Sequence, residues 1–325
     1  MPEINYSQAI NDALREEMRR DPSVITLGED VALIGGNFGV TKGLLDEFGG
    51  ERVKDTPISE DAIVGVSLGA AMVGLKPVPE IMFSTFLGIC MDQLLNQVSA
   101  IRYMSGGQVD IPLVIRTTNS LGRSGGAQHS GRPEAWLMHM PGIKIVIPST
   151  PYDAKGLLKT AIREPDPVVF FEHALLYYGA KGEVPNEEYT IPLGVADIKR
   201  PGTDVTIVAY SMMVPKALKA AEILAADGIE AEVVDPRTLV PLDMETILNS
   251  VKKTQHLIVA SEEVASAGVC AEIAFQVARD AFDYLDAPVE RVAAANVHVP
   301  FSPPLEKYMM PKVEDIVAAA KRTLQ

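Results

Sequence analysis

Basic residues are scarce in this chain. Its 325 residues include 29 Lys and Arg against 43 Asp and Glu, which gives a formal net charge of -14. Proteins that bind nucleic acid usually present a basic surface that neutralises phosphate groups. We therefore expect no nucleic acid among the partners of this protein.

Cysteines are few, and long hydrophobic runs are missing. The two cysteines, Cys90 and Cys270, lie far apart in apolar surroundings, where buried thiols behave as small hydrophobic groups. This pattern indicates neither a disulfide framework nor a zinc site. No stretch approaches the ~18 apolar residues of a membrane span, and the chain does not open with a basic segment followed by an apolar one. We expect a soluble, cytoplasmic protein that does not bind a membrane.

Two common phosphate-binding motifs are also absent. No G-x-G-x-x-G follows the early strand-like runs, and no G-x-x-x-x-G-K-[ST] occurs. The first motif binds the pyrophosphate of dinucleotides, and the second wraps the phosphates of nucleoside triphosphates. The chain therefore offers no familiar means of holding a phosphate by itself.

One catalytic template is present, at Gly65-Val66-Ser67-Leu68-Gly69. It fits the G-x-S-x-G pattern of serine hydrolases, which requires a strand that runs into the serine and a helix that leaves it. Here the small residues extend through one helical segment instead, and close helix packing explains Gly65 and Gly69 better. A serine hydrolase acting through Ser67 stays an alternative.

The length and the pattern of hydrophobic residues predict two α/β domains. A chain of 325 residues with 47% hydrophobic composition exceeds the size at which one core usually stops growing. Short apolar runs alternate with amphipathic segments, which favours mostly parallel sheets covered by helices on both faces. In the first half, strands are expected at 24–27, 78–81, 113–117, 143–147 and 168–171, and helices at 9–18, 61–74, 86–104 and 151–163.

A break in composition separates the two halves. Between 179 and 201 prolines and glycines mix with charges and no apolar period survives, so we expect a domain at 1–185, a linker at 186–202 and a second domain at 203–325. The alternation then resumes. Strands are expected at 205–210, 231–234, 257–260 and 289–292, and helices at 214–227, from 243, at 267–281 and from 313.

The candidate catalytic centre is Glu60, at the end of Asp55-Thr56-Pro57-Ile58-Ser59-Glu60. This segment brings a carboxylate to the start of an apolar helix, where partial removal from water favours a shifted pKa. A structural alternative is that Ser59 caps the helix, with Glu60 and Asp61 stabilised by the positive field of its first turn.

A second group of candidates follows two of the predicted strands. His129 lies on a loop of small residues beyond the strand at 113–117, and Met82 and Phe86 follow the strand at 78–81. Ligands of open parallel sheets bind at the carboxyl ends of the strands. His129 is the best candidate for proton transfer, although it could be a loop histidine bonded to the backbone. Met82 and Phe86 could hold a flat heterocycle, although core packing is the usual fate of such residues.

Several motifs in order along the chain resemble the beta subunit of the thiamine-diphosphate-dependent component of 2-oxo acid dehydrogenase complexes. The resemblance runs nearly end to end, and some stretches lean towards the acetoin dehydrogenase branch, with pyruvate dehydrogenase close behind. The motifs are Asp55 to Glu60, Gly69-Ala70-Ala71, Met91-Asp92-Gln93, Tyr103-Met104-Ser105-Gly106-Gly107, Ala127-Gln128-His129-Ser130, Asp153-Ala154-Lys155-Gly156-Leu157 and Asp286-Ala287-Pro288.

The resemblance implies an N-terminal pyrimidine-binding domain and a C-terminal transketolase-like domain. It implies that a separate alpha subunit, in an alpha2beta2 heterotetramer, holds Mg²⁺ and the diphosphate of the cofactor, which would explain the missing phosphate motifs. The shared site forms the cofactor ylide, cleaves a carbon–carbon bond of a 2-oxo acid or acetoin, and passes the acyl group to a lipoyl domain. The dihydrolipoyl acyltransferase core is implied as a further partner.

By the same resemblance, site residues can be assigned. Glu60 corresponds to the glutamate that bonds the aminopyrimidine ring, and His129 to the histidine that faces substrate or lipoyl group. Ile58, Met82 and Phe86 would line the cofactor. In some members of the family a potassium ion is bound, mainly by backbone carbonyls, at positions that match Leu113, Ala161, Ile162, Glu164 and Asp166.

One departure from the family pattern occurs beside His129. Gly131-Arg132-Pro133 replaces the glutamine-containing sequence expected there, so the substrate contacts can differ from those of pyruvate enzymes. The sequence leaves the choice among acetoin, pyruvate and branched-chain 2-oxo acids open. It also leaves two alternatives from the same fold, a non-catalytic assembly subunit and a sugar-phosphate transketolase-like relative.

Overall fold

A computed structural model describes all residues from 1 to 325 and divides them into two compact units. The first unit comprises Met1–Arg123 and Gln128–Leu193, and the second comprises Ser124–Ala127 and Gly194–Gln325. None of the helices is long and apolar enough to cross a membrane. The chain therefore has the two α/β units that the alternating pattern predicts.

The first unit is built on a parallel sheet. Its strands follow the order β6-β7-β5-β4-β2-β3, and every neighbouring pair is parallel. Strands β5 and β7 are buried along their whole length, as expected for a sheet with both faces covered. The bounds are β2 Val24–Gly28, β3 Val53–Asp55, β4 Lys76–Ile81, β5 Val114–Asn119, β6 Lys144–Val146 and β7 Val168–His173.

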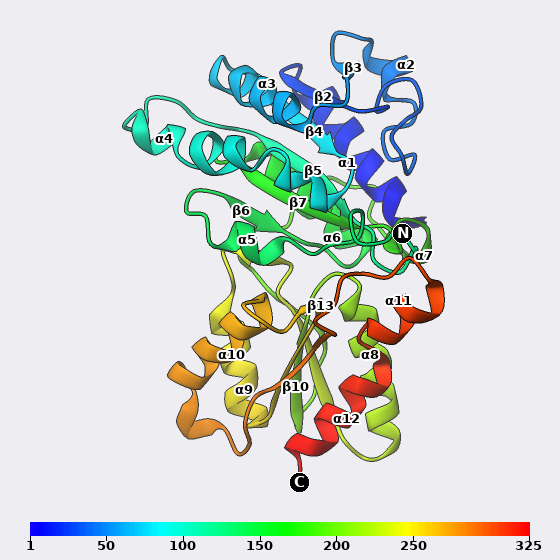
Figure 1. Cartoon of the computed structure of the whole chain (residues 1–325), viewed down its shortest axis with the longest axis vertical. Coiled ribbons are helices and arrows are strands. Elements are labelled where there is room, and N and C mark those ends of the chain that lie inside the picture. The colour runs from blue at the N-terminus through cyan, green and yellow to red at the C-terminus, as the bar shows by residue number, and fades with distance from the viewer. The chain divides into compact units, whose positions relative to one another are not determined.

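Helices α1 (Tyr6–Arg20) and α6 (Pro151–Arg163) pack against each other beside this sheet (Figure 1). Their starts are fixed by local signals: Asn5 accepts a hydrogen bond from the Gln8 amide, and Thr150 accepts one from the Asp153 amide. A small antiparallel pair joins β1 (Glu3–Asn5) to β8 (Lys181–Glu183). The other helices are α2 Leu44–Phe48, α3 Glu60–Met72, α4 Ile101–Met104, α5 Glu134–Met138 and α7 Leu176–Gly179.

The prediction of one continuous helix at 86–104 is wrong. The segment contains a 3-10 helix, η1 (Ser84–Gly88), then a π-helix, η2 (Gln93–Val98), and then α4. Gly88 is a poor helix former and ends the first piece. The wider turn of η2 shifts the register of the side chains that follow it. The result is a bent connection that carries Phe86 on its first piece.

The second unit has a smaller sheet with the order β14-β13-β10-β11-β9. Four strands are parallel, and β9 runs antiparallel to β11. Part of the segment expected as a linker, 186–202, therefore forms this edge strand. The bounds of these five strands are β9 Asp197–Arg200, β10 Val205–Ala209, β11 Ala231–Asp235, β13 Leu257–Val264 and β14 Glu290–Ala294. A further short strand of this unit, β12 (Thr238–Val240), is not part of this sheet.

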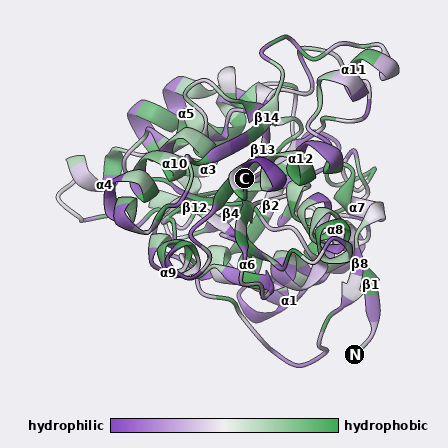
Figure 2. Cartoon of the chain, turned by 90° about the horizontal axis from the view of Figure 1, so that it is seen from below, coloured by the Kyte–Doolittle hydropathy of each residue, from purple (hydrophilic) through white to green (hydrophobic).

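The core of the second unit lies between this sheet and two helices, α8 (Met213–Ala226) and α12 (Val313–Thr323). Valine and isoleucine from the strands meet alanine and leucine from the helices. Figure 2 shows both colours along the helices, as expected where one face is buried and the other meets solvent. The remaining helices are α9 Met244–Thr254, α10 Val269–Asp280, η3 Phe282–Tyr284 and α11 Pro303–Met309.

Candidate active site

Glu60 is the first residue of α3, and its side chain is buried, with 4% of the residue exposed. The helix packs on β4, so the packed structure behind it fixes the position of the carboxylate. Asp55, at the start of the same segment, accepts hydrogen bonds from the amides of Ala32 and Leu33, at 2.7 and 3.2 Å. Both ends of the segment that delivers Glu60 are thus held in place.

The Glu60 carboxylate takes part in no hydrogen bond and no ion pair within the chain. Buried carboxylates are normally paired, because leaving one unpaired costs several kcal/mol or forces it to bind a proton. The hydroxyl of Thr56, in the same segment, is also buried without a hydrogen-bond partner. The start of α3 therefore presents polar groups suited to a partner from outside the chain.

A second carboxyl group lies close to Glu60. Burial, and then the charge of Glu60, raise the pKa of Glu29, with smaller contributions from Asp30 and Glu80. Glu29 directly follows β2, at the carboxyl end of a parallel strand. The sequence analysis missed this residue, although an acidic residue directly after a buried strand is a signal that could have indicated it.

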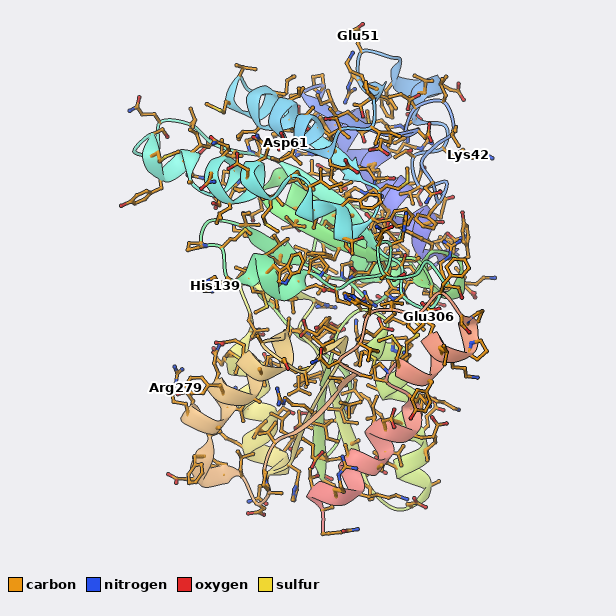
Figure 3. The ribbon with its side chains drawn as sticks, viewed as in Figure 1. Lys42, Glu51, Asp61, His139, Arg279 and Glu306 are labelled. Carbon is orange, nitrogen blue, oxygen red and sulfur yellow. The ribbon has the colours of Figure 1, made fainter.

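The structure speaks against the capping alternative at Ser59. The Ser59 side chain makes no hydrogen bond to the first turn, and only its carbonyl accepts one, from the Ile63 amide at 2.9 Å. Asp61 is exposed at the N-terminal end of α3, where Figure 3 labels it. Asp61 can thus interact favourably with the positive N-terminal end of the helix dipole while it stays exposed to solvent. The burial of Glu60 needs another explanation.

His129 belongs to an aromatic group with Phe83 and Phe86. Its ring meets Phe83 and Phe86 edge to face, with ring centroids 5.1 and 5.3 Å apart, and the two phenylalanine rings are 5.5 Å apart. The His129 ring forms no hydrogen bond within the chain, so the alternative of a histidine bonded to the backbone is wrong. The imidazole is thus held in place by ring contacts, and neither of its nitrogens forms a hydrogen bond within the chain.

Three hydroxyl groups hold the backbone around His129. Ser120 donates to the carbonyl of His129 itself. Thr85 donates to the carbonyl of Gln128 at 2.5 Å, and Ser84 donates to that of Gly131 at 3.1 Å. Two of these donors lie on η1 beside Phe86, so this short helix orders both the aromatic ring and the histidine loop.

Cys90 links the surroundings of Glu60 to the aromatic group. Burial, with smaller contributions from the charges of Glu60 and Asp61, raises the pKa of the Cys90 thiol to about 12. The thiol donates weakly to the carbonyls of Leu87 and Phe86, at 3.5 and 3.9 Å. Glu60 therefore lies near the stretch of chain that carries Phe86 and, through Ser84 and Thr85, holds the backbone around His129.

The other two residues predicted to line a cofactor differ in exposure. Met82 is half-buried between β4 and η1, as Phe86 is on η1. Ile58 is 83% exposed, which is unusual for an isoleucine just before a buried catalytic candidate. An exposed apolar residue at this place suits contact with a ligand or another protein.

Comparison with known proteins identifies the family. The family described as "Transketolase, pyrimidine binding domain" matches residues 2–179, and "Transketolase, C-terminal domain" matches residues 194–316. A relative from Cupriavidus necator, the beta subunit of acetoin:2,6-dichlorophenolindophenol oxidoreductase, is 48% identical, with 99% of this chain and 98% of that protein covered.

The chain belongs to this family of thiamine-diphosphate-dependent, transketolase-like dehydrogenase beta subunits. Two relatives from Bacillus subtilis support the same family assignment. The pyruvate dehydrogenase E1 component subunit beta is 47% identical over the full length of both chains, and the 2-oxoisovalerate dehydrogenase subunit beta is 44% identical, with 99% of this chain and 98% of that protein covered.

The fold also agrees with a solved structure. A split-gene transketolase, described as an inactive beta4 tetramer, is similar with a TM-score of 0.82 and 25% sequence identity, covering 99% of this chain and 98% of that one. The predicted family and the predicted two-domain transketolase-like fold are confirmed. The cytoplasmic location stays a prediction, because the relatives include both bacterial and mitochondrial proteins.

The potassium ligands predicted from the family also stay a prediction. The carboxylate of Glu164 pairs with Lys144, and that of Asp166 pairs with Lys144 and Arg102. The carbonyl of Leu113 accepts from the Val168 amide at 2.8 Å, and that of Ala161 accepts from the Glu164 amide at 3.3 Å. No cluster of three or more His, Cys, Asp or Glu side chains is placed to hold a metal ion. Any cation here would depend on backbone carbonyls, including that of Ile162.

Arg132, the departure from the family pattern, is engaged by its neighbours. Its guanidinium lies 2.9 Å from Nε2 of His173 and 3.9 Å from the Glu134 carboxylate. Glu134 in turn accepts a hydrogen bond from Asn119 at 2.7 Å. These buried polar groups support the backbone just after His129. His139 is exposed at the end of α5, where Figure 3 labels it.

The serine hydrolase alternative is wrong. Ser67 lies inside α3, is fully buried, and donates its hydroxyl to the Ile63 carbonyl at 2.7 Å. It therefore lacks the exposed strand-to-helix turn that the template requires. A Cβ at Gly65 would lie 3.6 Å from the side chain of Gln93 on η2, whereas one at Gly69 would meet nothing within 4 Å. A contact of 3.6 Å is an ordinary van der Waals distance, so close helix packing within the chain requires glycine at neither position.

Proposed function

We propose that this chain is the catalytic beta subunit of a thiamine-diphosphate-dependent dehydrogenase component that acts on a 2-oxo acid or acetoin. The observation that carries the proposal is the Glu60 carboxylate, buried at the start of α3 and unpaired within the chain. The family membership supplies the ligand that would pair with it. A purely structural subunit would have no reason to keep such a costly group.

The surroundings of Glu60 fit the aminopyrimidine half of thiamine diphosphate. When bound, the cofactor supplies an electron sink for cleaving a bond to the substrate carbonyl carbon. Glu60 would hydrogen-bond a pyrimidine ring nitrogen and share a proton with it. Because the site is partly dry, that bond is stronger than it would be in water. Ile58, Met82 and Phe86 would exclude water and hold the flat ring.

His129 would serve the later steps of the reaction. Its ring is fixed by Phe83 and Phe86, and its nitrogens are not bonded within the chain. A histidine can donate or accept a proton near neutral pH. We assign it proton transfer at the substrate oxygen or at the lipoyl sulfur during transfer of the acyl group.

A separate alpha subunit would complete the site. This chain has neither of the common phosphate-binding motifs, so Mg²⁺ and the diphosphate would be held by that partner, in an alpha2beta2 heterotetramer. The relatives act within acetoin, pyruvate and 2-oxoisovalerate dehydrogenase systems. The acyl group would pass to a lipoyl domain of an acyltransferase core, whose basic binding module suits the acidic surface of this chain.

The decisive experiment is reconstitution of the chain with its alpha partner and assay with pyruvate, branched-chain 2-oxo acids and acetoin. Glu60→Gln keeps the shape of the side chain but removes the acidic group. We expect it to lower kcat by a factor on the order of 10² to 10⁴ on the best substrate, the range typical of a lost acid–base group. Assembly with the alpha subunit should be unchanged.

The matched control is Asp61→Asn, one residue later in the same helical turn. Asp61 is exposed while Glu60 is buried, so the control removes the same charge from the first turn. We expect at least half of the normal activity. Equal activity in the two variants would contradict a role for Glu60 in the chemistry and favour a non-catalytic assembly subunit.

Binding of the cofactor tests whether the site is shared. The isolated chain should bind thiamine diphosphate weakly in isothermal titration calorimetry, and addition of the alpha subunit should produce tight, Mg²⁺-dependent binding. Tight Mg²⁺-dependent binding by the isolated chain would contradict the shared site.

A further inference from the structure

The backbone that leads to His129 adopts an unusual conformation. Gly122, Ser124 and Gly126 all have positive φ angles, of 89°, 57° and 70°. Glycine adopts this region freely, but Ser124 does so at an energetic cost, and such residues persist where the surrounding structure holds them. The conformation at Ser124 therefore needs a contact that maintains it.

Glu306 supplies that contact. Its carboxylate accepts a hydrogen bond from the Ser124 amide at 2.8 Å, and the Ser124 hydroxyl lies 3.4 Å from the same oxygen. Glu306 is on α11 and is only 2% exposed. The two residues are 182 positions apart in sequence, yet both belong to the second unit.

A second contact from the same region supports the loop. A Cβ built at Gly126 would lie 3.5 Å from the ring of Phe301, which precedes α11. The loop residues Ser124–Ala127 are thus covered by the segment that carries Phe301 and Glu306. On its other side, the chain is fastened at Gln128 and His129 by Thr85 and Ser120.

We propose that Glu306 is a positioning residue for His129. It acts through the backbone: the carboxylate fixes the left-handed turn at Ser124, and this turn sets where the chain enters the short stretch that ends at His129. A bond from a buried carboxylate to an amide is charge-assisted and stronger than a neutral one. This inference rests on the proposed function, because it assigns Glu306 to the step that His129 serves.

Amide hydrogen exchange of the full-length chain tests the structural part of this inference. Glu306→Ala should raise the exchange rate of the amides at 124–129 by about tenfold or more, as expected for a lost bond to a charged group. Glu306→Gln, whose amide oxygen can still accept, should raise it less. Lys307→Ala, at an exposed position on the same helix, should leave it unchanged.

Two exchange results would overturn the inference. One is unchanged exchange at 124–129 in Glu306→Ala. The other is an increase that is as large in β10 and β13 as in the loop, since that would assign Glu306 a general role in folding. The Gln variant guards against loss of the fold, because it preserves the size and the acceptor of the side chain.

A double-mutant cycle in the assembled enzyme tests the catalytic part. Glu306→Ala should lower kcat for acyl transfer to a lipoyl domain at least tenfold with little change in KM, and should add little to the loss caused by His129→Ala. Independent, multiplicative losses would overturn the assignment. A normal rate of acyl transfer in His129→Ala would refute the proposed role of His129, and with it the catalytic part of this inference. The exchange experiment on Glu306→Ala does not depend on that role, so it still tests whether Glu306 holds the loop.

Discussion

The guanidinium of Arg116 on β5 donates two hydrogen bonds, of 2.6 and 2.8 Å, to the carboxylate of Glu172 on β7. A third bond, of 2.8 Å, reaches Glu80 on β4, and the Tyr177 hydroxyl donates to Glu172 at 2.6 Å. Arg116 and Glu172 are almost completely buried. Burial opposes the charge of Arg116, but the charges of Glu172 and Glu80 outweigh it and raise the pKa of Arg116. The network lies across the strands whose carboxyl ends lead to the site.

Removal of the Arg116 guanidinium from this network should lower the stability of the fold. Arg116→Met leaves the Glu172 and Glu80 carboxylates buried without their partner, and we expect a loss of about 3–5 kcal/mol in the free energy of unfolding. Urea denaturation followed by circular dichroism measures it. Arg279→Met, at an exposed pair with Asp280, should change the free energy of unfolding far less, because solvent screens exposed ion pairs. Similar losses in the two variants would contradict this account of the network.

Ser67 should be chemically inert. Because it is buried and bonded to the Ile63 carbonyl inside α3, a serine-directed fluorophosphonate should not label it in the folded protein. Ser67→Ala should leave the reconstituted activity within about twofold of normal, since removing both the hydroxyl and its need for a partner is nearly neutral. Stoichiometric labelling detected by mass spectrometry would restore the hydrolase alternative.

Both cysteines should resist alkylation in the native state. Burial raises the pKa of Cys90 and that of Cys270 to about 12, so the reactive thiolate is scarce at pH 8. Iodoacetamide should modify neither residue in the folded chain and both after denaturation in urea. Rapid native labelling of Cys90 would show that the surroundings of Glu60 open to solvent.

The ion pair at Asp21 should make stability depend on pH. Hydrogen bonds from Ser23, and then from Lys76, lower the pKa of Asp21 below its ordinary value of 3.8. A lowered pKa in the folded state stabilises the fold above that ordinary value, and the contribution is lost as the pH falls through the folded-state pKa. Asp21→Asn should therefore cost about 1 kcal/mol at pH 7. In urea titrations, the difference in the free energy of unfolding between wild type and variant should become smaller below pH 3.8. A difference that grows there would contradict the lowered pKa of Asp21.

Local signals in the sequence were enough to place many elements. Helix α6 has the predicted bounds, 151–163, because Thr150 caps it and Pro151 suits its first turn. Asp243 caps α9 in the same way. The prediction of one continuous helix at 86–104 was wrong, because periodicity alone does not distinguish one helix from a bent series of short ones.

The candidate site could be predicted only in part. Glu60 was indicated by its place at the start of an apolar helix and His129 by its loop of small residues beyond a predicted strand, and the family resemblance supported both. The position of Glu29 directly after a buried strand could have indicated it, but its raised pKa depends on burial and on Glu60 and Glu80 in other segments, which the sequence does not show. Nor could it show that Phe83 joins Phe86 and His129, since ring contacts depend on how η1 and the loop pack together.

The sequence by itself determined the family, the two α/β domains and the residue types available for chemistry, because alternation, caps and motif order are properties of neighbouring positions. Only the tertiary structure decided that Glu60 is buried without a partner and that Ser67 is enclosed in a helix. It alone paired Glu306 with Ser124 across 182 positions. Burial and long-range pairing result from how distant segments pack, and no local pattern encodes that packing.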